Sequence, residues 1–186
     1  MIRCVAVLLI ACILSGCGIK DDFLDQALEL REKIIVSDGC TFETTITADY
    51  GDMLYTFQMD CIVDSEKNVM FTVTAPETIS GVTGMISKDS SELTFDDTAL
   101  AFPILADDQL TPVCVPWVFV NALTSGYISG CSKEAIGFCL YIDDNIVERP
   151  LHLEVFLDET LNPYRVDLFW NQQRVISADI HNFIIQ

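Results

Sequence analysis

The sequence predicts an α+β fold that is mostly β: one antiparallel sheet of about ten strands, with an amphipathic helix before it and an apolar helix in mid-chain. Two observations carry this prediction. Many short consecutive runs alternate apolar and polar side chains with a period of two, which is typical of antiparallel strands with one buried face. Two longer stretches have apolar residues at helical spacing or on nearly every side instead.

The first expected element is a helix over residues 21–36. Acidic residues come early in it, basic residues come late, and Glu29 and Lys33 form an i,i+4 pair, all of which favours a helix. The segment 37–39, Ser-Asp-Gly, ends it. The apolar residues expected on one face are Phe23, Leu24, Ala27, Leu28, Ile34 and Ile35.

Five strands are expected next, over residues 41–50, 53–61, 68–75, 78–87 and 91–96. Gly51-Asp52 and the segment 64–67 supply turns between the first three. The apolar side chains predicted to share the buried face include Phe42, Ile46, Ala48, Tyr50, Met53, Tyr55, Phe57, Met59, Cys61, Val69, Phe71 and Val73.

A second helix is expected between Thr111 and Gly126. Its residues are apolar nearly all round, so we expect it to be buried or to lie across a cavity mouth. Its first residue is left open, because Pro112 and Pro116 cannot both occupy the first helical position.

The remaining chain again predicts strands. Residues 127–133 and 136–143 have the pattern of a hairpin, and three one-sided runs follow it. No repeat or domain boundary is evident, so residues 20–186 are expected to form one domain. The apolar residues of the three runs are Leu151, Leu153, Val155 and Leu157; Tyr164, Val166, Leu168 and Trp170; and Ile176, Ala178, Ile180 and Ile184.

The first residues have the features of an export signal. One positive charge, Arg3, precedes an apolar run over residues 4–14 that is short for a membrane span of about 20 residues. The run ends in Leu14-Ser15-Gly16-Cys17, which resembles the bacterial lipobox. This resemblance implies cleavage between Gly16 and Cys17 and lipid on Cys17.

Residues 1–16 would then be a lipoprotein signal peptide and residues 17–19 a short tether. The mature protein would lie on the extracytoplasmic face of the cell membrane, held by the lipid. Two alternatives stay open: an uncleaved anchor over residues 2–19, and ordinary cleavage without lipid.

The charge of the chain is strongly negative, at −18. Removal of residues 1–16, which contain Arg3 and no acidic residue, brings it to −19. Such a chain is a poor partner for nucleic acid or for anionic lipid headgroups. Membrane attachment is therefore expected to come from the anchor and not from the surface of the domain.

Five cysteines remain after Cys17, an odd number that cannot all pair within the chain. Cys40 and Cys61 flank one expected hairpin, and Cys131 and Cys139 flank another, so each pair is a possible disulfide. Free thiols are the alternative. No CxxC spacing occurs, and no zinc site is expected.

The order of elements resembles the LolA/LolB-like lipoprotein carrier superfamily, with the closest likeness to its membrane-anchored Gram-positive members. The most specific stretch is residues 73–81, VTAPETISG, followed by Leu93-Thr94-Phe95. The resemblance covers nearly all of residues 20–186. It implies a half-open barrel: a strongly bent antiparallel sheet whose concave apolar face is covered by helices. It also implies binding of an acyl chain or a lipid-bearing partner in that concavity.

Residue patterns of catalysis are absent from the sequence. His152 and His181 are far apart, no GxSxG or glycine-rich phosphate loop occurs, and the acidic pairs, among them Asp107-Asp108, lack EF-hand spacing. We therefore expect no enzyme activity, cofactor or metal. Met53, Met59, Met70 and Met85 either line an adaptable apolar pocket or fill the core.

The leading hypothesis is a non-catalytic, membrane-anchored protein that binds an acyl chain or lipid between its sheet and helices. The alternative is an envelope protein that binds other proteins, in signalling or assembly, with a filled core and no lipid ligand. A cavity of about 300–1,000 Å³ under the middle helix would favour the first hypothesis. A solid core with an exposed apolar patch would favour the second.

Overall fold

The computed structural model describes residues 22–106, 109–144 and 151–186. The expected signal peptide, the cleavage site at Gly16 and Cys17, the tether and the pair Asp107-Asp108 lie outside the described residues. Within those ranges, no helix has the length and apolar character needed to cross a membrane.

The described chain forms two α-helices, α2 (Asp22–Val36) and α3 (Val115–Ser125), and two 3₁₀ helices, η1 (Glu77–Ile79) and η2 (Pro112–Cys114). The strands before α3 are β1 (Cys40–Asp49), β2 (Leu54–Val63), β3 (Val69–Ala75), β4 (Thr83–Ile86), β5 (Ser91–Phe95), β6 (Thr98–Ala101), β7 (Leu105–Ala106) and β8 (Gln109–Leu110). Those after it are β9 (Tyr127–Lys133), β10 (Phe138–Asp144), β11 (Leu151–Leu157), β12 (Pro163–Trp170) and β13 (Gln173–Ile185).

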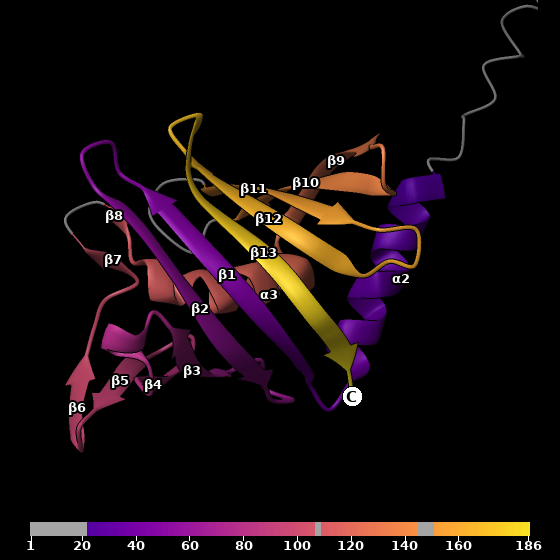
Figure 1. Ribbon diagram of the computed structural model, residues 1–186. Helices are drawn as coiled ribbons and strands as arrows, with labels where there is room; N and C mark the ends of the chain where they lie inside the picture. The colour runs from indigo at the N-terminus through magenta and orange to yellow at the C-terminus, as the bar shows by residue number, and fades with distance from the viewer. Residues whose placement is uncertain (1–21, 107–108, 145–150) are drawn as a thin grey trace, which may run out of the picture.

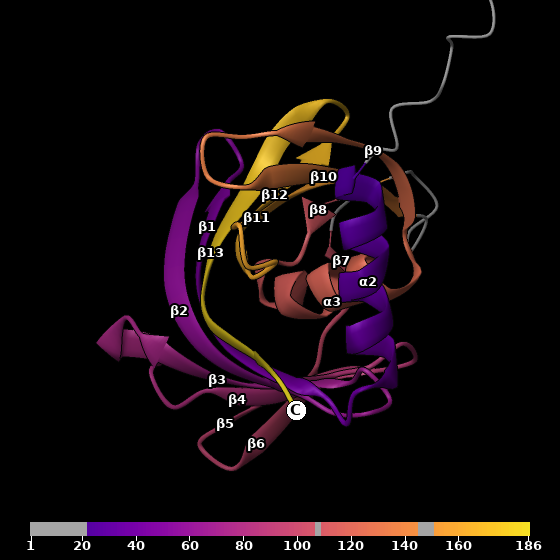
Figure 2. The ribbon, with the colours of Figure 1, turned by 90° about the vertical axis from the view of Figure 1, so that its right-hand side faces the viewer.

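Eleven of these strands form one antiparallel sheet in the order β6-β5-β4-β3-β2-β1-β13-β12-β11-β10-β9. The first and last strands of the chain, β1 and β13, are neighbours in the middle of the sheet. The sheet is strongly curved and open: in Figure 2 it wraps around α3, and α2 covers the open side next to β9. Strands β3–β6, which we call the wing, continue the sheet from β2 and turn away from the strands on its other side (Figure 1). This half-open barrel is the fold expected from the sequence.

The core lies on the concave face. Along β1 every second residue from Cys40 to Ala48 is buried, Thr44 included, while the residues that alternate with them are more exposed, as the period of two predicts. Strands β2, β3 and β11 repeat the pattern. The ring of Phe42 packs against Phe119 of α3 and Phe183 of β13, with ring centroids 5.7 and 5.9 Å apart. The sheet and the middle helix therefore share one core.

Helix α3 is buried on nearly every side, as its composition predicts. The two prolines whose roles were left open both lie near its start: Pro112 begins η2, and Pro116 lies in the first turn of α3. A proline fits both places because the first backbone N–H groups of a helix have no partner within it.

The buried face of α2 differs from the expected one. Ala27, Leu30 and Ile34 are buried, whereas Leu24, Leu28 and Ile35 are exposed. The helix is also fixed at two other points: Phe23 packs on Phe138 of β10, with ring centroids 5.1 Å apart, and Arg31 bonds to the end of α3. These contacts turn the helix so that only part of its apolar stripe meets the core.

The wing and its connection to α3 were predicted in part. Strand 91–96 is present as β5, but the strand expected over 78–87 is divided into η1 and the shorter β4. Strands β6, β7 and β8 were not predicted, because residues 98–110 have no clear alternation.

One expectation about β13 is wrong. Ile184 was placed on the buried face with Ile176, Ala178 and Ile180, yet it is 58% exposed. The pairing of β13 with β1 shifts by one residue near Asn182, whose φ is 52°. This bulge reverses the alternation, so that Phe183 and Ile185 pack on the core and Ile184 points outward.

Candidate functional site

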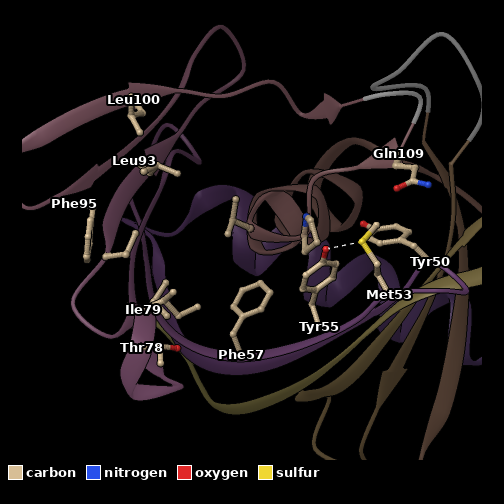
Figure 3. Close-up of a pocket in the computed structure, with 14 residues that line it drawn as sticks. Tyr50, Met53, Tyr55, Phe57, Thr78, Ile79, Leu93, Phe95, Leu100 and Gln109 are labelled. Atoms are coloured by element: carbon tan, nitrogen blue, oxygen red, sulfur yellow. Dashed lines mark hydrogen bonds between the residues drawn. The ribbon is translucent and has the colours of Figure 1, made fainter.

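An apolar groove of about 650 Å³ lies between the wing and the segment that leads into α3. Figure 3 shows side chains from β2, η1, β5 and β6 around a common space, with Gln109 and Tyr50 at one end of it. The lining residues are Tyr50, Met53, Tyr55, Phe57, Val73, Thr78, Ile79, Val82, Leu93, Phe95, Leu100, Gln109, Pro112 and Val113.

The groove has a buried floor and an exposed rim. Phe57 and Val73, at the floor, continue the concave face of β2 and β3 and belong to the core. The rim side chains are between 41% and 56% exposed, although all are large and apolar: Met53, Tyr55, Ile79, Phe95 and Leu100. A rim of this kind keeps a contiguous apolar surface in contact with water, which soluble surfaces usually avoid unless something covers it.

The polar groups of the groove gather near its Tyr50 end. The hydroxyl of Tyr50 donates a hydrogen bond to the carbonyl oxygen of Leu110 in β8, next to Gln109. Burial raises the pKa of Tyr50 to about 12, with smaller contributions from Cys114 and Tyr55. The hydroxyl therefore stays protonated and remains a donor. The hydroxyl of Tyr55 contacts the Met53 sulfur at 3.0 Å.

The segment between β6 and α3 is held in place by side-chain hydrogen bonds. The Ser91 hydroxyl donates to the carbonyl of Phe102, and the Thr111 hydroxyl donates to the carbonyl of Pro103 at 2.7 Å. The backbone N–H of Thr111 donates to the carbonyl of Ile104 at 2.8 Å. These bonds fix Pro112 and Val113 as one wall of the groove.

The groove is not where the leading hypothesis placed the ligand. We expected a cavity between the sheet and the middle helix, but side chains of α3 that face the sheet, such as Phe119 against Phe42, are buried in the core. The opening lies beside the start of α3, where the wing extends past the helix. Because α3 is apolar on nearly every side, it is stable when it is buried in the deepest part of the concave face.

The four methionines are divided between places. Met53 is on the groove rim and Met59 is buried in the core. Met70 and Met85 lie on the convex side of the sheet, because they alternate with the core residues Val69, Phe71 and Ile86. The expectation of a methionine pocket is therefore correct for Met53 alone.

The cysteines are placed as follows. Cys40 and Cys61 are buried on the same face of β1 and β2, but Cys40 is opposite Val63 and Cys61 is opposite Phe42, so they are diagonal neighbours. Both are thiols in this structure, and a disulfide between them stays a prediction.

Cys131 and Cys139 have a different relationship. Cys131 is opposite Leu140, while Cys139 is opposite Ser132. Their side chains therefore lie on opposite faces of the β9–β10 hairpin. This register does not favour the disulfide that the sequence left possible between them.

The two histidines are not brought together. His152 lies on β11 and its Nδ1 is 2.7 Å from the Asp143 carboxylate, while its ring stacks on Tyr141. His181 lies on β13, opposite Glu43 of β1. Neither lines the groove.

Sequence reasoning assigned no ligand-binding residue, although it had placed many of the residues that line the groove on the apolar face of the sheet. Leu93 and Phe95 were part of the stretch that carried the family resemblance, but Leu100, Gln109 and the role of the Tyr50 hydroxyl were not foreseen. Residues 98–110 carried one detectable signal, several apolar side chains without strand or helix spacing.

Comparison with solved structures found similar folds at low sequence identity. A LolA superfamily protein from Nitrosomonas europaea has 9% identity and a TM-score of 0.48, and the match covers 86% of this chain and 93% of that one. A conserved protein from Thermus thermophilus has 9% identity and a TM-score of 0.49, with 87% and 88% covered. Lipoprotein LppX of Mycobacterium tuberculosis has 11% identity and a TM-score of 0.40, with 87% and 92% covered.

No protein-family description matches the sequence, and no curated protein is similar to it at a significant level. By its own architecture the described chain is a half-open barrel, one curved antiparallel sheet covered by two helices.

Proposed function

We propose that this chain is a non-catalytic lipoprotein of the cell envelope that binds an acyl chain or lipid in the groove between the wing and η2. The observation that carries the proposal is the groove itself. Its volume of about 650 Å³ is within the range of small-molecule sites, and its walls are almost wholly apolar. A hydrocarbon chain along Phe57, Val73 and Leu93 would remove the exposed rim from water.

The charge of the groove favours an uncharged head group. None of the described lining residues is charged, and the polar groups available are the two tyrosine hydroxyls, Thr78 and Gln109. The chain as a whole carries a net charge of −18. A phosphate or carboxylate would meet no cation there and would leave water at a cost, whereas hydroxyls or an ester would find donors and acceptors.

The membrane attachment is a separate part of the proposal and rests on the lipobox at residues 14–17. If Cys17 carries lipid, replacing it with serine should move the protein from the membrane fraction to the soluble fraction. Two acyl chains or more are needed for stable anchoring, so the change in fractionation should be nearly complete. A Cys17→Ser protein that still sediments with membranes would contradict lipidation and leave the groove proposal untouched.

The groove is tested with residues 20–186 produced without the anchor in a host that contains lipid. Native mass spectrometry of the purified domain is followed by solvent extraction and identification of any bound lipid. We expect a stoichiometric ligand, or uptake of added diacylglycerol in preference to phosphatidylglycerol. An apo mass with no uptake of either lipid would overturn the proposal.

A further inference from the structure

A row of large apolar side chains crosses the convex face of the sheet. Met85 of β4 is directly opposite Met70 of β3, and Met70 is opposite Ile62 of β2. Ile62 is opposite Thr41 of β1, and Thr41 is opposite Ile184 of β13. We call these five residues the convex row. Its four large side chains are between 43% and 58% exposed.

The row is continuous from strand to strand, with Thr41 between the apolar side chains of Ile62 and Ile184. Neighbouring strands are about 4.8 Å apart, so the row extends over about 19 Å. The next row of the same strands is polar, since it runs through Glu43, Asp60, Thr72 and Thr83. Single exposed apolar residues are ordinary, but a line of them across a sheet whose neighbouring line is polar indicates a contact surface.

Two carboxylates lie beside the row. Glu43 of β1 is directly opposite Asp60 of β2, and both are exposed. Like charges in this position destabilise a strand pair. Among residues 22–106, 109–144 and 151–186, neither carboxylate forms an ion pair; Glu43 accepts a hydrogen bond from the Asn182 amide at 2.9 Å.

The convex row and the two carboxylates border the same hollow, which has a volume of about 270 Å³. Its lining includes Ile62 and Ile184 on the apolar side and Glu43 and Asp60 on the acidic side. A lysine or arginine side chain has the matching chemistry, because its aliphatic stem packs on apolar side chains while its charged end reaches a carboxylate.

We propose that the convex row and the Glu43–Asp60 pair form a docking surface for a cationic amphipathic segment of a partner protein. The segment's apolar side chains would cover Met70 and Met85, and a lysine or arginine would enter the hollow between the two carboxylates. Charge complementarity selects this occupant. A second copy would bring Glu43 and Asp60 close to the same carboxylates, and an anionic membrane would be repelled by them.

This surface is independent of the groove. Side chains on the two faces of a strand point in opposite directions, so the convex row lies on the far side of the sheet from Phe57 and Val73. The bulge at Asn182 contributes to it directly, because it turns Ile184 outward into line with Thr41. A partner can therefore bind whether or not lipid occupies the groove.

The test uses the full-length protein in a neutral detergent and a labelled synthetic helix of leucine and lysine, about 18 residues long, with apolar and cationic faces. Binding is followed by fluorescence polarisation, with protein-free micelles as the baseline. Met70→Thr/Met85→Thr should weaken binding about tenfold, and Glu43→Gln/Asp60→Asn about fivefold with a smaller salt dependence. A matching peptide with glutamate for lysine should not bind.

Two control variants carry the same kinds of substitution at exposed positions away from the convex row. Ile136→Thr changes an exposed apolar residue in the β9–β10 turn, and Asp96→Asn/Asp97→Asn changes an exposed carboxylate pair in the β5–β6 turn. Both should bind like the unmodified chain. Threonine favours strands, so the Met70→Thr/Met85→Thr protein should fold, which its melting curve checks.

Crosslinking tests the contact directly, without a variant that weakens binding. Benzoylphenylalanine at position 70 should crosslink to the lysine peptide, and the same group at position 136 should not. The proposal is overturned if the convex-row variants bind as the unmodified chain does. It is also overturned if the row instead drives binding to phosphatidylcholine vesicles or dimerisation in analytical ultracentrifugation.

Discussion

Arg31 of α2 donates a hydrogen bond of 2.6 Å from Nε to the backbone carbonyl of Leu123 in the last turn of α3. Its Nη2 donates to the carbonyls of Gly126 at 2.8 Å and Ala122 at 3.3 Å. The last carbonyls of a helix largely lack partners within it, although that of Ala122 also accepts the backbone N–H of Gly126 at 2.9 Å. A cation there also meets the negative end of the helix dipole. One side chain therefore joins the two helices that cover the concave face.

Arg31→Ala should lower the free energy of unfolding by about 2–3 kcal/mol, because partly buried carbonyls lose a charged donor. The measurement is urea denaturation followed by circular dichroism. Lys33→Ala is the matched control: Lys33 forms an exposed ion pair with Glu29 at 2.8 Å, and its loss should cost less than about 0.5 kcal/mol. Equal losses in the two variants would mean that Arg31 does not hold α3.

Because the rim side chains are exposed, substitutions there should change the affinity for a ligand without changing the stability of the protein. Phe95→Ser/Leu100→Gln removes two exposed apolar side chains from the rim, so the affinity for a fluorescent acyl-chain probe should fall about tenfold. The melting temperature should stay close to that of the unmodified chain. Ile136→Gln, which changes an equally exposed residue away from the groove, serves as the control. Unchanged affinity in the rim variant would place any acyl-chain site elsewhere.

The stability of the protein should depend on which residue replaces Asn182. Its φ of 52° lies in the left-handed region, which asparagine and glycine adopt more easily than branched residues. Asn182→Val should therefore lower stability by about 1–2 kcal/mol, whereas Asn182→Gly should have a smaller effect. Thermal unfolding of the two variants side by side decides this. A valine protein as stable as the glycine protein would argue against a left-handed bulge.

The cysteines give a prediction that depends on pH. Burial raises the pKa of Cys40 to about 11, although Lys67 lowers it slightly, and burial raises that of Cys114 to about 12. Both thiols are therefore protonated near neutral pH and should react slowly with iodoacetamide in the folded protein. Reactivity should increase as the pH approaches these values. Peptide mass spectrometry after timed alkylation gives the rate at each site, and Cys131, which is partly exposed, should react first.

The same reagent tests the remaining disulfide prediction. In denaturant without a reductant, all five cysteines after Cys17 should be alkylated if they are thiols, as they are in the structure. Protection of Cys40 and Cys61 together, removed by a reductant, would establish the bond that the sequence allowed between them.

Alternation along each strand was readable from sequence because it is a local property. A period of two fixes which residues of β1, β2, β3 and β11 face the core, whatever the strands pair with. The same reasoning failed at Ile184, where a single residue in the left-handed region reverses the alternation. It also failed for α2, because Arg31 and Phe23 orient the helix through contacts with partners far away in the sequence.

The sequence by itself determined the fold class, the buried middle helix and the one-sided strands, since each follows from side chains a few positions apart. Only the tertiary structure decided where the open space lies and which exposed side chains form a surface. The groove depends on how far the wing extends past α3, and the convex row depends on register across five strands. Both are set by contacts between residues distant in the chain, which no local period encodes.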